Sequence, residues 1–470
     1  MTTIRLTMAQ ALTRFLAAQM TEVDGAKVPI FAGVFAIFGH GNVAGFGEAL
    51  YPYRDCLPTY RAHNEQAMAH AAVAFAKASF RRRMMAVTSS IGPGATNMVT
   101  AAALAHVNRI PVLLLPGDVF ANRRPDPVLQ QVEDFGDGTV SANDCFRPVS
   151  RYFDRITRPE QIVPALHRAM AVLTDPAECG PVTLALCQDV QAEAYDYPES
   201  FFDERLWVPR RVRPSEDELS AAVAALRSAE RPLIVSGGGT LYSGATEALK
   251  AFAERFGIPV SETQAGKSSL PAAHDLNMGA IGVTGTSASN VLAEEADVIL
   301  AVGSRLQDFT TGSWALFKNE TQTVIGLNTQ VFDAAKHRAL PLVADALAGL
   351  KDLAADLGGW RAPEAWTAKA KAGRDAWFRD ADKATGASNA LLPSDGQVIG
   401  AVQRVMGSEA TLVCASGGLP GELHKLWQAG SPGTYHLDYG FSTMGYEIAG
   451  GLGTKMAKPD KEVVVMLGDG

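Results

Sequence analysis

The stretch MMAVTSSIGPGATN, residues 84–97, decides the fold. Its first part, residues 84–89, is typical of a buried strand, and the Gly-Pro-Gly turn that follows opens a helical pattern reaching Ala105. Outward from this stretch, an Ala-rich helical pattern at 64–79 precedes the strand, and an apolar run at 112–115 follows the helix. Strands that alternate with helices in this way predict a parallel sheet with crossover helices.

The same alternation continues along the chain and predicts an α/β protein with three doubly wound parallel-sheet domains. We expect these domains at 1–190, 205–365 and 390–470. A polar stretch at 193–214 has Pro and charged residues without periodicity, which predicts a linker, and a helical connector is expected at 362–387. Further expected elements are helices at 7–20 and 397–405 and strands at 30–38, 182–186, 231–235, 298–302, 324–327, 411–414 and 462–467.

The bulk composition excludes several classes of protein. The chain has 470 residues, of which 47% are hydrophobic, and this is enough for several buried cores. Its net charge of -8 gives no general attraction to nucleic acid or to an anionic membrane. No apolar run reaches the roughly 18 residues of a membrane span, and a signal-peptide core is lacking. We therefore expect a cytoplasmic protein with no nucleic-acid or membrane partner.

The cysteines and histidines show no pattern of a transition-metal site. The five cysteines are scattered without the paired spacing of a zinc site, and the nine histidines form no HExxH cluster. We expect buried thiols in a reducing compartment.

A run of three glycines, Gly237 to Gly239, follows the strand expected at 231–235. A dinucleotide-binding fingerprint would require another glycine at the position of Tyr242. Backbone crowding at a strand end explains the glycines without any ligand. We favour crowding and leave nucleotide binding by the middle domain as the alternative.

Four short motifs in the two outer domains carry the functional information. They are RAHNEQA at 61–67, SSIGPGATN at 89–97, GFSTMG at 440–445 followed by GGLG at 450–453, and GDG at 468–470. In this order and spacing they resemble the pyrimidine-binding and diphosphate-binding domains of the thiamin-diphosphate (ThDP) enzymes related to acetohydroxyacid synthase. The resemblance covers the whole chain and implies ThDP and Mg²⁺ as cofactors.

The resemblance also implies roles for single residues. Glu65 corresponds to the carboxyl group that hydrogen-bonds the pyrimidine ring, which ThDP needs in order to lose the proton of its reactive carbon. Met444 corresponds to the apolar wedge that keeps the two cofactor rings folded together, and the carbonyl near Ser442 to the aminopyrimidine acceptor. The alternatives are a solvated Glu at a helix start and a Met that only fills the core. The other implied cofactor-binding residues are Gly92, Asn97, Gly418, Leu419, Gly468, Asp469 and Gly470.

The metal site is implied in the same way. Mg²⁺ commonly takes one or two protein carboxylate or amide oxygens besides phosphate and water. Asp469 corresponds to the metal-binding Asp of the family, and its flanking glycines allow the backbone to approach the phosphates. An Asn ligand is expected further along, beyond residue 470, so we expect either a truncated sequence or an incomplete metal site.

Two loops are more similar to the ring-opening hydrolases of inositol breakdown than to the carboligases of the family. They are FGHGN at 38–42, where carboligases usually have a Pro-Gly-Gly-type loop, and DPVLQQVE at 126–133. The likeness implies a small-molecule cyclic dione as substrate, cleaved by water between its two carbonyl carbons without loss of carbon dioxide. The candidate catalytic residues are Glu65, His40, Asn42, Gln130 and Gln131.

Two other functions stay open at this point. A carboligase or 2-oxoacid decarboxylase would share Glu65, Met444 and Asp469 and differ only in its substrate pocket. A truncated homologue without activity would instead be a binding or regulatory protein. The family arrangement places Glu65 of one subunit against Met444 and Asp469 of another, which implies a homodimer or homotetramer with active sites at the subunit interface.

Overall fold

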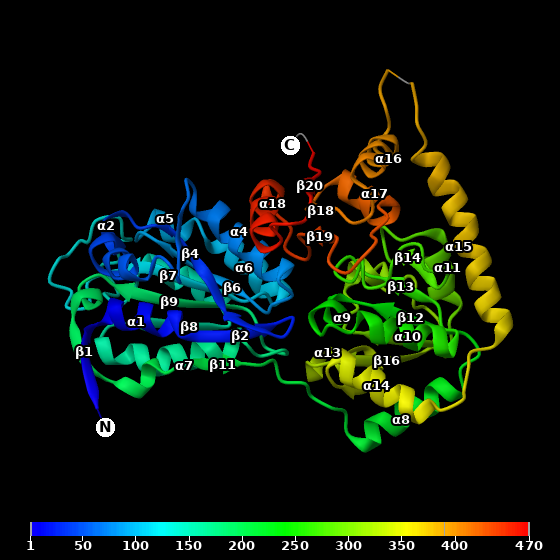
Figure 1. Ribbon diagram of the computed structural model, residues 1–470, viewed down its shortest axis with the longest axis horizontal. Coiled ribbons are helices and arrows are strands. Elements are labelled where there is room, and N and C mark those ends of the chain that lie inside the picture. Colours follow the sequence, from blue (N-terminus) through cyan, green and yellow to red (C-terminus); the bar gives the residue numbers. More distant parts are fainter. Residues whose placement is uncertain (1, 390, 469–470) are drawn as a thin grey trace. The chain divides into compact units, whose positions relative to one another are not determined.

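The computed structural model of the chain describes residues 2–389 and 391–468. Its elements divide into two compact units (Figure 1). Unit 1 comprises Met1–Arg210 and Gly440–Pro459, and unit 2 comprises Arg211–Tyr439 and Asp460–Gly470. Parallel sheets form the centre of both units, so the expected α/β class is confirmed.

The main sheet of unit 1 has six parallel strands in the order β5-β4-β6-β7-β9-β8. These strands are β4 (Phe31–Ile37), β5 (Thr59–Arg61), β6 (Met84–Ser89), β7 (Val112–Asp118), β8 (Tyr152–Ile156) and β9 (Pro181–Cys187). Every residue of β6, β7 and β9 is buried, as is typical of parallel strands covered by helices on both faces. Figure 1 shows α4 and α6 on one side of this sheet and α1 and α7 on the other.

The helices of unit 1 follow the sequence pattern with two differences. They are α1 (Met8–Ala17), α2 (Gly39–Asn42), α3 (Glu48–Leu50), α4 (Glu65–Ala78), α5 (Pro93–Thr96), α6 (Val99–Asn108), α7 (Ile162–Leu173) and α18 (Tyr446–Ala457), with a π turn η1 (Val43–Gly47) and 3₁₀ turns η2 (Tyr51–Tyr53), η3 (Ala142–Val149), η4 (Pro159–Gln161), η5 (Val190–Ala192) and η6 (Glu199–Phe202). The helix expected at 7–20 ends at Ala17, because the next residues form a strand. The helix expected to reach Ala105 is split into α5 and α6.

The stretch at 193–214 was wrongly expected to be only a linker, because it contains two strands. β10 (Ala194–Pro198) pairs with β1 (Thr3–Thr7), and β11 (Arg205–Trp207) pairs with β2 (Gln19–Val23), which also pairs with β3 (Ala26–Pro29). Both short strands are mostly exposed, so they lack the alternating apolar pattern by which strands are recognised. Their partners lie near the start of the chain, and unit 1 consequently extends to Arg210.

Unit 2 contains two parallel sheets. The larger has six strands in the order β14-β13-β12-β15-β16-β17, which is the 3-2-1-4-5-6 order of the dinucleotide-binding folds, and the smaller has the order β19-β18-β20. The strands are β12 (Pro232–Ser236), β13 (Val260–Glu262), β14 (Asn277–Ala280), β15 (Val298–Val302), β16 (Thr323–Asn328), β17 (Leu340–Val343), β18 (Thr411–Cys414), β19 (Tyr435–Leu437) and β20 (Val463–Val465). The helices are α8 (Glu216–Arg227), α9 (Gly238–Tyr242), α10 (Thr246–Phe256), α11 (Ser287–Glu295), α12 (Asp308–Thr311), α13 (Val331–Ala335), α14 (Ala346–Leu357), α15 (Glu364–Ala384), α16 (Asp395–Met406) and α17 (Gly418–Leu426), with a 3₁₀ turn η7 (Lys336–Arg338).

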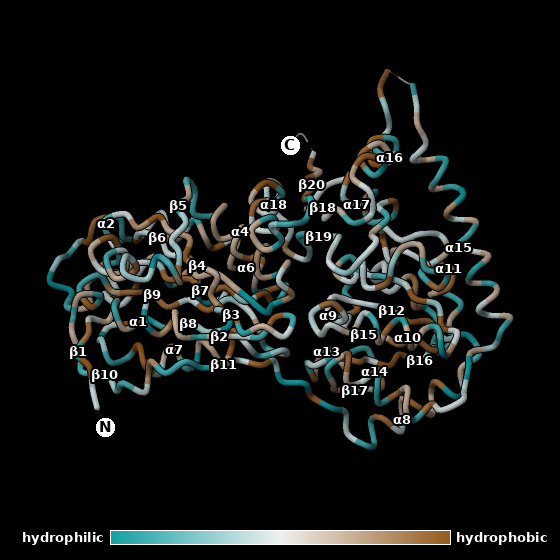
Figure 2. The backbone as a smooth tube through the Cα atoms, in the orientation of Figure 1, coloured by the Kyte–Doolittle hydropathy of each residue, from teal (hydrophilic) through white to brown (hydrophobic). Residues whose placement is uncertain are grey.

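The larger sheet of unit 2 separates two hydrophobic cores. Ile234 and Leu300 belong to a cluster with side chains of α8, α10 and α14, whereas Leu233 and Ile299 belong to a cluster with side chains of α11 and α15. Neighbouring residues of one strand point to opposite faces, so continuous apolar strands fill both cores. Figure 2 shows hydrophobic stretches along the central strands of this unit.

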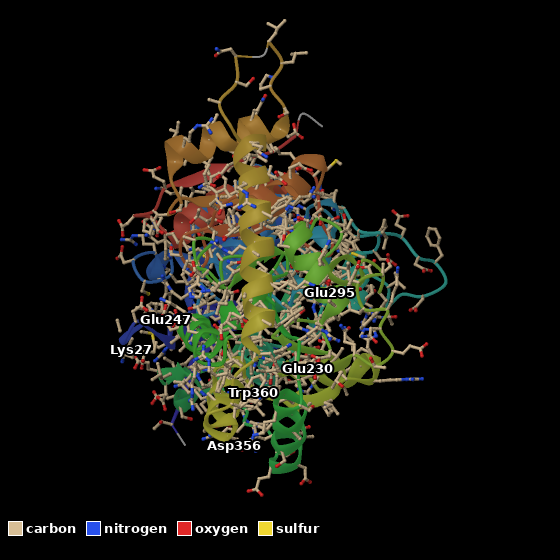
Figure 3. All side chains as sticks on the ribbon, turned by 90° about the vertical axis from the view of Figure 1, so that its right-hand side faces the viewer. Lys27, Glu230, Glu247, Glu295, Asp356 and Trp360 are labelled. Atoms are coloured by element: carbon tan, nitrogen blue, oxygen red, sulfur yellow. The ribbon has the colours of Figure 1, made fainter. Side chains whose placement is uncertain are left out.

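The connector expected at 362–387 is the long helix α15, which packs on α11. Lys369 of α15 forms an ion pair with Glu295 at the end of α11, and Glu295 is labelled in Figure 3. Trp366 and Ala370 point into the core on the same side of the helix. The connector is therefore a helix that packs on the core of unit 2.

Backbone crowding explains two of the three glycines after β12, Gly237 and Gly239. A Cβ atom at Gly237 would lie 2.5 Å from the carbonyl oxygen of Gly303, and one at Gly239 would lie 2.6 Å from the Cα atom of Gly303. These residues stand where β12 and β15 end side by side. Gly237 and Gly239 are needed for the contact between two backbone segments, which agrees with the interpretation that we favoured.

We expect Gly239→Ala to destabilise the protein although Ala favours helices. Ala would add about 1 kcal/mol of helix propensity in α9. The new methyl group would meet backbone at 2.6 Å, and such overpacking costs about 1 to 3 kcal/mol. Urea unfolding should show a lower midpoint for this variant. The matched control is Gly359→Ala, whose Cβ atom would have nothing within 4 Å, and equal midpoints for the two variants would contradict the crowding explanation.

Candidate active site

Three loops of unit 1 meet at the carboxyl edge of its parallel sheet, where α/β proteins commonly bind ligands. A Cβ atom at Gly39, after β4, would lie 2.4 Å from the side chain of Ser90, after β6. One at Gly92 would lie 1.6 Å from the carbonyl oxygen of Gln130, in the loop after β7. Gly39 and Gly92 also have positive φ angles of 50° and 64°, so glycine is required at both contacts. The structure thus brings the motifs at 38–42, 89–97 and 126–133 together.

Glu65, the first residue of α4, lies at this edge with one carboxylate oxygen fixed. Its Oε2 accepts a hydrogen bond from Asn97 Nδ2 at 3.1 Å. Its Oε1 has no hydrogen-bond partner in the part of the chain that the structure describes, and a Cβ atom at Gly94 would lie 3.0 Å from it. Glu65 is half-buried, so it is oriented by the protein rather than freely solvated. The arrangement leaves Oε1 able to accept a hydrogen bond from a ligand.

The helix that carries Glu65 packs closely against α18. A Cβ atom at Gly453 of α18 would lie 2.0 Å from the carbonyl oxygen of Ala71 of α4, so the two backbones touch. The ring of Tyr446 meets the ring of His70 edge to face at a centroid distance of 5.3 Å. Burial lowers the pKa of His70 to about 4, so this imidazole is neutral at physiological pH. His70 was not predicted, since a lone His in an Ala-rich helix gives no sequence signal.

Met444 lies in a turn between two glycines just before α18. Gly440 and Gly445 have φ angles of 83° and 87°, and the buried carboxylate of Glu447 accepts a hydrogen bond from the Gly445 N–H at 3.0 Å. Met444 is 68% exposed, and the neighbouring Ser442 is exposed as well. Met444 therefore does not fill the core of unit 1, and its side chain is accessible to a ligand.

His40 and Asn42 occupy different environments although they are two residues apart. His40 is exposed at the loop, and its carbonyl oxygen accepts a hydrogen bond from Gln188 at 3.2 Å. Asn42 is fully buried: its Nδ2 donates to Thr88 Oγ1 at 2.7 Å, and its Oδ1 accepts from Gln191 Nε2 at 2.9 Å. Both ends of the Asn42 amide form hydrogen bonds within the protein. The geometry therefore indicates that Asn42 stabilises the loop and does not contact the substrate.

Gln130 and Gln131 also lie in different environments, although they are consecutive residues. Gln130 is exposed, has a positive φ of 63°, and places its carbonyl oxygen against Gly92. Gln131 turns inward, and its Oε1 accepts a hydrogen bond from the Ala142 N–H at 3.0 Å. Gln130 is thus the better placed of the two to meet a ligand at the loop edge.

The predicted diphosphate-binding residues lie in unit 2. Gly418 and Leu419 form the first turn of α17, and the preceding Gly417 has a φ angle of 130°. Gly468 is exposed after β20. Asp469 and Gly470 lie outside the described residues, so their roles stay predictions.

Comparison with protein families identifies the chain. Models of the thiamine pyrophosphate enzymes match in three places: the N-terminal TPP binding domain at residues 32–137, the central domain at 219–353 and the C-terminal TPP binding domain at 415–470. A protein of Geobacillus thermodenitrificans, named 3D-(3,5/4)-trihydroxycyclohexane-1,2-dione hydrolase, is 48% identical over 493 aligned residues, covering 100% of this chain and 76% of the relative. The chain belongs to the thiamine pyrophosphate enzyme family. Its cofactor is accordingly ThDP, as predicted from the motifs.

Other members of the thiamine pyrophosphate enzyme family are similar over the same length. Proteins of Bacillus anthracis and Bacillus cereus are 45% identical, covering 100% of this chain and 77% of each relative. They are named 3D-(3,5/4)-trihydroxycyclohexane-1,2-dione hydrolase and hydrolase 1 of the same substrate.

Within the described residues, no helix combines the length and the apolar character that a membrane crossing requires.

Proposed function

We propose that this thiamine pyrophosphate enzyme is a C–C hydrolase that opens 3D-(3,5/4)-trihydroxycyclohexane-1,2-dione to 5-deoxy-glucuronate in myo-inositol breakdown. The observation that carries the proposal is the 48% identity along the whole chain to a relative named for this reaction. The site gives further support, since the loops at 38–42 and 126–133, which first pointed to a cyclic dione, lie beside the Glu65 region.

The residues at the carboxyl edge of unit 1 fit the pyrimidine end of ThDP. When bound, ThDP supplies a carbon nucleophile and stabilises negative charge on the attacked carbon of the substrate. Glu65 would hold the pyrimidine ring through Oε1, while Asn97 fixes Oε2 and thereby the direction of the carboxyl group. Gly94 keeps the space in front of Oε1 free, because a Cβ atom there would lie 3.0 Å away.

Other residues would act on the substrate and on the cofactor rings. Met444, exposed before α18, would pack against the rings. His40 and Gln130 are the exposed polar residues of the two loops and would hydrogen-bond the hydroxyl and carbonyl groups of the dione. Asn42 and Gln191 would hold the His40 loop in place, since they bond each other at 2.9 Å.

Mg²⁺ and self-association complete the proposal. Asp469 would supply a carboxylate oxygen to Mg²⁺ at the diphosphate. A second copy of the chain would cover the exposed apolar side chains of Ile448 and Leu452, which lie four residues apart on one face of α18. Glu65 and Met444 belong to the same unit of one chain. Light scattering of the ThDP-loaded protein would test whether the protein forms the proposed homodimer or homotetramer.

The proposed function is tested by comparing two substrates. Purified protein with ThDP and Mg²⁺ should consume the cyclic dione and leave pyruvate unchanged. Release of carbon dioxide from pyruvate, or its coupling to a second molecule, would favour the decarboxylase or carboligase alternative. Absence of turnover with either substrate, while ThDP binds, would favour a binding or regulatory homologue.

A further inference from the structure

A series of hydrogen-bonded side chains connects the larger sheet of unit 2 with α17. The Tyr435 hydroxyl donates to Gln264 Oε1 at 3.4 Å, and Gln264 Nε2 donates to Thr284 Oγ1 at 3.1 Å. Thr284 Oγ1 lies 2.8 Å from Nδ1 of His424 on α17. Gln264 and Thr284 belong to loops after β13 and β14, whereas Tyr435 and His424 belong to the part of unit 2 that contains the smaller sheet. These side chains therefore hold two layers of the unit together.

The hydrogen bonds of Thr284 are compatible with a neutral His424 ring. Thr284 accepts a hydrogen bond from Gln264, so its own proton is free to be donated to His424 Nδ1. In this arrangement Nδ1 is unprotonated and accepts the bond. Burial lowers the pKa of His424 well below its ordinary value, which is consistent with a neutral ring.

The surroundings of His424 favour the same neutral state. His424 is 0% exposed, and the charge of the buried Lys267 lowers its pKa further. Lys267 is balanced by the buried Glu262 and lies 5.5 Å from the ring centre of Tyr435. Protonation of His424 would bury a second positive charge beside Lys267, so the bond from the Thr284 hydroxyl is the stable arrangement.

Thr284 also touches α17 one turn before His424. A Cβ atom at Gly421 would lie 3.1 Å from Thr284 Cγ2. Gly421 is three residues from His424 and three residues from Gly418, so it is a neighbour of both on the helix surface. Thr284 is thus in contact with the face of α17 that leads to the turn of Gly418 and Leu419.

We propose that Thr284 and His424 are positioning residues for ThDP. Their hydrogen bond fixes α17 against the larger sheet, and the Gly418–Leu419 turn is thereby held in the orientation that binds the cofactor. Both side chains act through the helix and touch no reacting atom. The inference rests on the proposed role of this turn in cofactor binding and is independent of which substrate the enzyme opens.

The test is the affinity for ThDP after removal of the Thr284 hydroxyl. Thr284→Val keeps the branched shape and leaves Gln264 Nε2 and His424 Nδ1 without their partner. Calorimetric titration with ThDP at saturating Mg²⁺ should give a Kd raised about tenfold, since an unpaired buried polar group disturbs the helix position. Thr284→Ser retains the hydroxyl and should restore the affinity. At saturating ThDP the KM for the dione should match that of the wild type.

Two results would overturn the proposal. One is a Thr284→Val protein that binds ThDP as tightly as the wild type, whether or not its Tm is lowered, and the other is a Thr284→Ser protein that is equally impaired. Thr284→Ala removes the same hydroxyl without a branched side chain and serves if the Val variant is unstable. A wild type that binds ThDP but leaves the dione intact would refute the proposed function and leave this test unaffected.

Discussion

Glu65→Gln is expected to reduce dione turnover by about 10²- to 10⁴-fold, the usual value of acid–base assistance. The substitution removes the ionisable oxygen that would face the pyrimidine ring. It leaves a side-chain oxygen to accept the bond that Asn97 now donates at 3.1 Å. Because the shape and this bond are kept, the Tm should change little. The measurement is kcat at saturating dione, ThDP and Mg²⁺, with thermal unfolding of the same sample.

Glu48→Gln is the matched control, because Glu48 is an exposed carboxylate in unit 1 without an assigned role. It should retain wild-type turnover. If the Glu65 variant keeps more than about a tenth of the wild-type rate, the loss is too small for acid–base assistance, and Glu65 does not have the proposed role.

Met444→Ala is expected to lower kcat on the order of 10²-fold, the size of effect that a misplaced reacting group produces. Without the thioether, the cofactor rings would lose the surface that keeps them folded. The stability of unit 1 should hardly change, since Met444 is 68% exposed. The comparison is with Met98→Ala, where the side chain is 0% exposed and truncation costs about 2 to 5 kcal/mol.

Met444→Leu should retain most of the activity, because it keeps a bulky apolar side chain. Unchanged kcat in the Ala variant would show that Met444 does not contact the rings. A fall in Tm as large as that of Met98→Ala would show that Met444 packs in the interior after all.

The strands at the centre of each unit were predictable because burial on both faces leaves a continuous apolar run. The strands at 84–89 and 411–414 have the bounds expected from the sequence, and that at 112–115 is a few residues longer. Helix ends were predictable where a cap marks them, as Asn64 does for α4. β10 and β11 could not be found in this way, since their pairing depends on strands near the start of the chain.

Family motifs selected the residues of the candidate site, whose roles stay predictions, whereas the contacts between these residues depend on the fold. Glu65 was assigned from its motif, and its hydrogen bond with Asn97 then explains why both motifs are needed. The burial of Asn42 could not be foreseen, because its amide bonds the backbone of two neighbouring strands, β6 at Ser89 and β7 at Leu115. The bond between Thr284 and His424 joins segments that are 140 residues apart, and no local pattern indicates it.

The most direct test of the account is the reaction of the cyclic dione in water labelled with oxygen-18. Hydrolysis between the two carbonyl carbons predicts one labelled oxygen in the carboxylate of the open-chain product, no carbon dioxide, and no product when ThDP is omitted. An unlabelled product, or a dione left intact by a protein that releases carbon dioxide from pyruvate, would contradict the assignment of this chain as a ThDP-dependent dione hydrolase.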